Sequence, residues 1–116
     1  MLVAGFKDGK GFLGHVDMIG TAFEDNVLAT GFGSYLALPI MRKRWHENMT
    51  EGEARALLED CLRVLFYRDC RALNRIQIAK ADAGGVAVSQ PFALDTVWDL
   101  AAFCQPKAGM DTDGSW

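Results

Sequence analysis

Short apolar runs separated by turn-forming residues dominate the first thirty positions. These runs occupy residues 2–6, 11–16, 18–23 and 27–29. Between the first two lies Lys7-Asp8-Gly9-Lys10, and an Asp-Gly step between apolar runs is typical of a β-hairpin, because glycine adopts a positive φ at little cost. Polar residues 24–26 separate the last two runs and predict a further strand pair. We therefore expect a β-meander over residues 2–29.

The glycine-rich step Gly31-Phe32-Gly33-Ser34 ends this pattern, and an apolar segment over 35–41 then predicts a short helix. Pro39 lies inside that segment and should sit in its first turns or kink it, because proline lacks the backbone N–H. The basic residues 42–44 follow at its C-terminal end, where cations complement the helix dipole. We interpret them as a solvated helix end.

A longer amphipathic helix begins after Thr50. Thr50 and Glu53 have the spacing of a capping box, in which each side chain bonds the backbone N–H of the other residue. Apolar residues then recur at three- and four-residue steps and form one stripe: Ala54, Leu57, Leu58, Cys61, Leu62 and Leu65. On the opposite side we expect the i,i+4 ion pairs Glu51–Arg55 and Glu59–Arg63. The stripe must pack on a hydrophobic partner.

A second hairpin and a last helix complete the pattern. The alternation over 76–79, the turn over 82–85 and the run 86–88 predict the hairpin. Asp95-Thr96 is a capping pair for a helix carrying Val97, Trp98, Leu100, Ala101 and Phe103, and we interpret residues 105–116 as a flexible tail. Segregated strands and helices indicate an α+β fold with antiparallel pairing. The predicted strands lack edge-protecting residues, so we expect tight assembly with other polypeptide.

Composition and charge narrow the class of protein. The chain has 116 residues, a single-domain length, with 50% apolar residues and a net charge of 12 − 15 = −3. The negative net charge argues against nucleic-acid binding. No apolar run could span a bilayer and no secretory signal is evident, so we expect a soluble chain. Cys61, Cys70 and Cys104 are an odd set without a CxxC pair, and with His15 and His46 they show no zinc-ligand spacing. We expect buried or partly buried free thiols in a reducing compartment, and neither metal nor cofactor.

No acid, base and nucleophile converge at a spacing typical of catalysis. Asp17 ends a predicted strand and is best explained as a turn residue, whereas Asp60 faces solvent in the helical pattern. Asp69 could be held in a structural ion pair by Arg68. The glycine step at 31–33 is too short for a phosphate loop.

Gly20-Thr21 is similar to the processing junction of hydrolases that use an N-terminal threonine. That chemistry needs a lysine near the threonine and a supporting aspartate further along the chain. The first lysine after Thr21 is Lys43, inside the basic helix end, and no acidic residue occurs over 26–46. We therefore expect Thr21 to be an ordinary strand residue.

Four segments carry a resemblance to a known family. They are FLGHVDMIG at 12–20, LATGFGSYL at 28–36, VLFYRD at 64–69 and NRIQIA at 74–79. Together they resemble the C-terminal half of a eukaryotic 20S proteasome β subunit, in collinear order over residues 2–104, and most of all a non-catalytic kind of β subunit. The resemblance implies about half of a four-layer αββα sandwich of the Ntn-hydrolase type, with residues 1–104 in that domain and 105–116 as the tail.

In catalytic members of that family the nucleophile is an N-terminal threonine whose aspartate and lysine helpers lie in the first third, a part that this sequence does not match. Two supporting serines of the second half correspond to Phe32 and Ala72, which carry no hydroxyl, although Asp69 remains. The resemblance therefore implies no catalytic residues and an architectural role in assembly of the β ring. It also implies ubiquitin- and ATP-dependent protein degradation in cytoplasm and nucleus. The implied partners are neighbouring β subunits, an α subunit and the opposite β ring.

A rival hypothesis is an independent small α+β enzyme or ligand-binding domain. It would require a closed core and a pocket, and the residues to test first are His15, Asp69 and Cys70.

Overall fold

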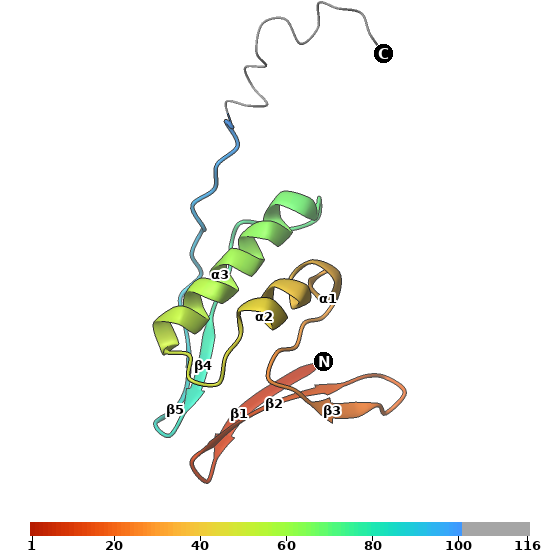
Figure 1. Ribbon diagram of the computed structural model, residues 1–116, viewed down its shortest axis with the longest axis vertical. Helices are drawn as coiled ribbons and strands as arrows, with labels where there is room; N and C mark the ends of the chain where they lie inside the picture. Colours follow the sequence, from red (N-terminus) through yellow and green to blue (C-terminus); the bar gives the residue numbers. More distant parts are fainter. Residues whose placement is uncertain (101–116) are drawn as a thin grey trace, which may run out of the picture.

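The computed structural model describes residues 1–100 and contains two antiparallel sheets and three helices (Figure 1). In chain order the elements are β1 (Leu2–Lys7), β2 (Lys10–Val16), β3 (Ala22–Glu24), α1 (Gly33–Leu36), α2 (Leu38–Arg44), α3 (Glu51–Arg68), β4 (Ala79–Asp82) and β5 (Gly85–Val88). β1, β2 and β3 form one sheet in that order, and β4 pairs with β5 in the other. The α+β class and the antiparallel pairing are confirmed. No helix within residues 1–100 is long and apolar enough to cross a membrane.

The first hairpin forms where the Asp-Gly step predicts it. Asp8 and Gly9 both have positive φ, 53° and 77°, as a two-residue turn between twisted strands requires. Leu2 lies opposite His15, and Phe6 lies opposite Gly11. The strand predicted over 18–23 forms only as β3 at Ala22–Glu24, because residues 17–21 form a turn, and the predicted strand over 27–29 is wrong. Val27 and Ala29 leave the sheet and pack against the helical core instead.

The expectation that Pro39 sits in the first turns of a helix is confirmed, although the segment predicted as one helix forms two, α1 and α2. α1 and α2 meet at Ala37, and Pro39 lies in the first turn of α2, where its missing N–H costs no hydrogen bond. The amide of Ala37 donates to the carbonyl of Gly33 at 2.9 Å, which closes α1. The three basic residues 42–44 occupy the last turn of α2, as the dipole argument expects.

The capping box at the start of α3 is also confirmed. The Thr50 hydroxyl accepts from the Glu53 amide at 3.3 Å, and the Glu53 carboxylate accepts from the Thr50 amide at 2.7 Å. The two predicted i,i+4 pairs are wrong, however. Arg55 pairs with Glu59 at 2.8 Å and Arg63 with Asp60 at 2.7 Å. Glu51 instead pairs with Lys80 of β4 at 2.7 Å.

A small core joins α2 to α3. Ala37, Met41, Leu57 and Cys61 are buried against one another, and the thiol of Cys61 points to the carbonyl of Ala37 at 3.8 Å. Partly buried side chains surround them: Val27, Ala29, Leu38, Ile40, Met49 and Leu65. Cys61 is thus a buried structural thiol as expected, whereas Cys70 is exposed, contrary to the expectation. Cys104 lies outside the described residues.

The second hairpin is confirmed with a later start. β4 begins at Ala79 rather than at Ile76, and the turn lies over 82–85 as predicted. Ile76 forms an isolated bridge with Phe92, with two hydrogen bonds of 2.9 Å. Between the bridge and the hairpin, the Ser89 hydroxyl accepts from the Ile78 amide at 2.9 Å. A side chain therefore replaces part of the regular strand pairing at this point.

The predicted helix from Asp95 is wrong over its described part, because residues 93–100 contain no helix. Side chains take the backbone groups that a helix would use: Tyr67 Oη accepts from the Val97 amide at 2.7 Å, and Arg63 donates to the Asp95 carbonyl at 2.9 Å. Trp98 stacks edge-on against Tyr67, with ring centroids 4.9 Å apart. The segment consequently runs extended beside α3 (Figure 1). Ala101, Phe103 and the predicted tail over 105–116 lie outside the described residues.

Candidate interaction surface

Asp17 is a turn residue, as the sequence analysis expects. Its carboxylate accepts from the amides of Ile19 at 3.0 Å and Thr21 at 2.9 Å, and its own amide donates to the Thr21 carbonyl at 3.0 Å. Partial desolvation raises the pKa of Asp17, but the hydrogen bonds from Thr21 and Ile19 outweigh it and hold that pKa below the usual range. Thr21 lies immediately before β3, and its amide is engaged by this turn.

The three residues of the rival hypothesis are not brought together. His15 stacks on Phe23 with ring centroids 5.1 Å apart, and the Asp69 carboxylate accepts from the Arg71 amide at 3.0 Å. Cys70 is exposed beyond the end of α3. No hydrogen bond joins any two of His15, Asp69 and Cys70 within residues 1–100. The predicted Arg68–Asp69 ion pair is likewise absent from this part of the chain.

Phe32 and Ala72 stand where the family resemblance places two supporting serines. Phe32 is the N-cap residue of α1 and is 60% exposed, with no side-chain bond that caps the helix. Ala72 is half-buried in the turn after α3, where its amide donates to the Asp69 carbonyl at 3.0 Å. Neither side chain has a hydroxyl group that could form a hydrogen bond, so these two positions offer Asp69 no hydroxyl partner.

Asp60 has a structural role that the helical pattern missed. Its carboxylate binds Arg44 at 2.6 Å and Arg63 at 2.7 Å, and the Arg44 contact ties the end of α2 to α3. The hydrogen bond from Arg44 is the main reason that the pKa of Asp60 lies below its usual value, while partial desolvation opposes it and Arg63 adds to it. Asp60 does face solvent as expected, with 44% of its side chain exposed, but it also joins α2 to α3, which the helical pattern does not predict. An aspartate 16 residues from an arginine gives no sequence signal for such a pair.

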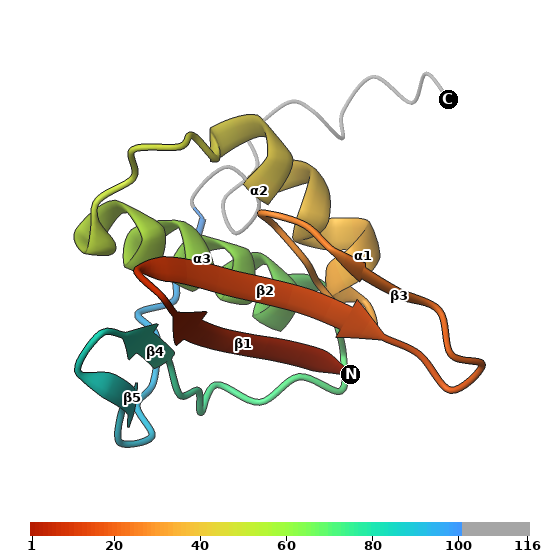
Figure 2. The same ribbon diagram turned by 90° about the horizontal axis from the view of Figure 1, so that it is seen from below.

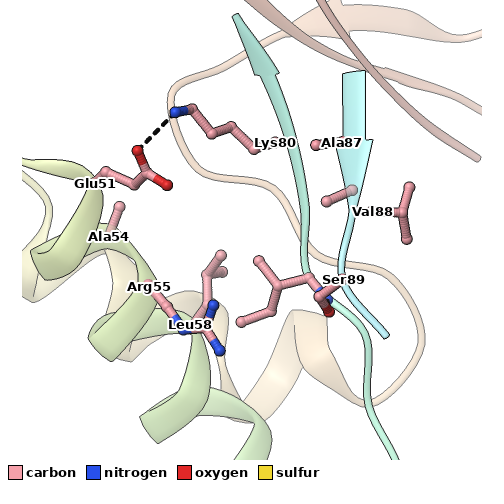
Figure 3. Close-up of a pocket in the computed structure, with 10 residues that line it drawn as sticks. Glu51, Ala54, Arg55, Leu58, Lys80, Ala87, Val88 and Ser89 are labelled. Carbon is pink, nitrogen blue, oxygen red and sulfur yellow. Dashed lines mark hydrogen bonds and ion pairs between the residues drawn. The ribbon is translucent and has the colours of Figure 1, made fainter. Parts of the chain in front are cut away.

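A pocket of about 480 Å³ lies between α3 and the β4–β5 hairpin (Figure 3). Its walls are largely apolar, with Ala54 and Leu58 from α3 and Val88 from β5. Lys80 crosses its rim and binds Glu51 at 2.7 Å, and it binds Asp82 at 3.0 Å. These carboxylates, Glu51 first, raise the pKa of Lys80. The ammonium is thus held protonated, which makes it an ion-pair partner rather than a base or nucleophile.

The most unusual feature is the three-stranded sheet, which carries apolar side chains on both faces. In the antiparallel register Leu2 and Phe23 share the face of His15, while Val3 and Phe12 lie on the other face. We call the exposed apolar side chains of these strands the sheet surface: Leu2, Val3, Phe6, Phe12, Val16 and Phe23, each 37–48% exposed. An antiparallel sheet exposed to water normally has one polar face.

Little of the described chain covers the sheet surface. In β1 only Gly5 is half-buried, and every residue of β3 is exposed. Viewed from below, β1 and β2 lie open in front of α3, with the β4–β5 hairpin close to the end of β1 (Figure 2). Nδ1 of His15 is buried without a hydrogen-bond partner within residues 1–100. Both faces therefore fit a sheet that other polypeptide covers.

The sequence predicts no metal site, and only the described residues bear on that prediction. Over 1–100 no group of three or more His, Cys, Asp or Glu side chains is placed to hold an ion.

Comparison with known proteins places this surface in context. A family model described as "Proteasome subunit" matches residues 1–81. The chain is 49% identical over 116 residues, all of its length, to "Proteasome subunit beta type-4" of Arabidopsis thaliana, covering 46% of that protein. It is 48% identical over 98 residues (83% of this chain, 38% of the relative) to the protein of that name from Dictyostelium discoideum. It is 42% identical over 103 residues (87% of this chain, 43% of the relative) to the protein of that name from Xenopus laevis. The chain spans less than half the length of these relatives.

Proposed function

Because the chain belongs to the proteasome subunit family, we propose that it serves as part of a non-catalytic β subunit of the 20S core particle, of the type-4 kind. Its role would be assembly of the β ring, and hence ubiquitin- and ATP-dependent protein degradation in cytoplasm and nucleus. The partners would be neighbouring β subunits, an α subunit and the opposite β ring.

The observation that carries this proposal is the sheet surface. Six large apolar side chains on two faces of one sheet are half-exposed, whereas only five hydrophobic residues of the described chain are buried. Apolar area exposed in this way favours association, at roughly 25 cal/mol for each Å² removed from water. A role in which other polypeptide encloses the sheet accounts for this distribution; an isolated globule does not.

The non-catalytic part of the proposal rests on the two positions without hydroxyls. Phe32 and Ala72 occupy places where the resemblance expects serines, and the aromatic ring of Phe32 is bulky as well as inert. The purified chain should not hydrolyse fluorogenic peptides. Turnover of these peptides that co-purifies with the chain would contradict the proposal. It would do so also if it survived in a Thr21→Ala variant, because another residue would then have to be the nucleophile.

The assembly part is tested by expressing the tagged chain in cells together with a complete set of proteasome subunits. We expect it to sediment with core particles on a density gradient. Phe12→Asp, which puts a charge on the sheet surface, should abolish that co-sedimentation, whereas Asn48→Asp, at an exposed polar residue before α3, is the control that adds the same charge outside the apolar surface. Wild-type chain that always sediments apart from proteasome subunits would refute the proposal.

A further inference from the structure

The two-residue turn between β1 and β2 holds one of its residues in an unfavourable backbone conformation. Within residues 1–100, Asp8 is the one residue other than glycine with a positive φ, 53°, and Gly9 follows with 77°. Residues with a Cβ occupy this region at an energetic cost, because Cβ approaches the backbone too closely. The strand pairing on either side, with Lys7 opposite Lys10, keeps Asp8 there.

Two chemically complementary groups of this turn have no partner. Asp8 and Gly9 are both exposed. Within residues 1–100 the Asp8 carboxylate forms no ion pair and accepts no hydrogen bond, and the Gly9 amide, which lies between the two strands, donates none. The space where a side chain at Gly9 would stand is empty within 4 Å. Carboxylates at other turns, by contrast, accept hydrogen bonds from nearby amides: Asp17, Asp69 and Asp82.

An aspartate that precedes glycine can close a five-membered ring through the next amide nitrogen, because glycine carries no side chain that hinders the approach. In a turn with two positive φ angles, the type I′ turn, ψ of the first residue is about 30°. That angle places the Gly9 nitrogen and the Asp8 Cβ on nearly opposite sides of the Asp8 Cα–C bond. The ring can therefore close only after the turn has opened and this bond has rotated.

We propose that Asp8 is a site of spontaneous isoaspartate formation, and that opening of the turn between β1 and β2 limits its rate. The Gly9 nitrogen forms a bond to Cγ of the protonated Asp8 carboxyl group, whose hydroxyl leaves with the amide proton as water. A second water adds to the former backbone carbonyl of Asp8, and the bond from that carbonyl to the Gly9 nitrogen breaks. The chain then runs through Cβ and Cγ of Asp8, with unchanged composition and without oxidation or reduction.

The modification would loosen the hairpin in which it occurs. An additional backbone atom does not fit a two-residue turn, whose twist matches that of the flanking strands. The nearest apolar cross-strand position, Phe6 opposite Gly11, would then lose its register. The inference concerns the turn alone, so it stands or falls independently of the proposed function.

The first experiment ages the purified chain at neutral pH beside a synthetic peptide of residues 4–13, which is too short to hold the hairpin closed. Isoaspartate is measured as methyl groups transferred from S-adenosylmethionine by an L-isoaspartyl methyltransferase. Cleavage after glutamate locates it, because Asp8 falls in the fragment of residues 1–24 and the other Asp-Gly step, at 113–114, falls in the last fragment.

We expect isoaspartate at Asp8 in both samples, forming about tenfold more slowly in the folded chain because backbone hydrogen bonds must first open. Equal rates in the chain and the peptide would overturn the inference. So would a folded chain that stays unmodified at Asp8 while the peptide converts completely.

The second experiment compares variants of the whole chain. Asp8→Glu cannot close a five-membered ring and should remove the signal from the fragment of residues 1–24. Phe6→Ser removes an aromatic side chain beside the turn and should raise the rate about two- to fivefold, because cross-strand pairs of this kind stabilise a hairpin. Val86→Ser is the matched control, since Val86 lies in the other hairpin and is 73% exposed.

Amide exchange across α3 shows whether the Phe6→Ser variant keeps the rest of the fold. With that exchange unchanged, a Phe6→Ser rate equal to those of wild type and Val86→Ser would mean that this hairpin does not control the reaction, and the inference would fail.

Discussion

Replacing Leu57 by alanine tests whether the small core between α2 and α3 holds the helices together. Leu57 is 4% exposed and belongs to the same cluster as Ala37, Met41 and Cys61. Truncation of a buried leucine costs about 2–5 kcal/mol, as lost transfer energy plus a term for the cavity that remains.

We expect the lower end of that range, about 2–3 kcal/mol, because a less rigid site collapses more readily onto the space left behind. A cavity of about 290 Å³ already borders Ala37, Met41 and Cys61, so the neighbours of Leu57 have room to move. For a domain of this size, that loss corresponds to a fall in Tm of about 10–20 °C.

The assay is amide hydrogen exchange across α3, read by mass spectrometry, together with thermal melting. Leu73→Ala is the control, since a leucine that is 79% exposed should change stability by less than about 0.5 kcal/mol. Leu57→Met, which conserves volume, should recover most of the loss. If Leu57→Ala and Leu73→Ala accelerated exchange in α3 to the same extent, the assignment of this cluster as the core would be wrong.

Three smaller perturbations test individual contacts. Thr50→Ala should cost about 1 kcal/mol and raise exchange in the first turn of α3, whereas Thr50→Ser should not. Asp60→Asn should cost no more than about 1 kcal/mol at neutral pH, because its pair with Arg44 is exposed to solvent. Folding lowers the pKa of Asp60, so the cost of Asp60→Asn should be complete above pH 3.8, the ordinary pKa of the carboxyl group, and should disappear as the pH falls through the pKa of the folded state. A cost that does not change with pH would contradict the ion pair. Asn74→Ala removes both hydrogen bonds of 2.8 Å to Leu94, so it should cost about 1–3 kcal/mol and release the Leu94 amide to exchange, and unchanged protection there would refute the role.

Local signals in the sequence were sufficient for several elements. The Asp8-Gly9 turn, the place of Pro39 in the first turn of a helix and the capping box at Thr50 each depend on residues within a few positions of one another. Their physics is local, because a backbone conformation or a hydrogen bond to the next turn decides the outcome. The same holds for Asp17, whose role as a turn residue follows from the amides just after it.

Contacts between distant segments decided the rest. Tyr67 and Arg63 take backbone groups of the segment after Leu94, so a sequence with helical features stays extended there. Likewise Glu51 pairs with Lys80, 29 residues away, in place of the neighbour one turn along the helix. Neither competition is visible to a local pattern, since each partner is brought within reach only by packing.

The candidate surface was predictable only in outline. Alternating apolar residues indicated strands with unprotected edges, and the family resemblance pointed to a subunit of a larger assembly. That both faces of one sheet are apolar was evident only from the strand register in the structure, which pairs Leu2 with His15 and Val3 with Gly14. The full exposure of Met18 and Ile19 likewise required the folded turn. By itself the sequence determined the local conformations and the family, because these depend on neighbouring residues; the tertiary structure decided which apolar side chains remain outside, because burial depends on every segment that packs nearby.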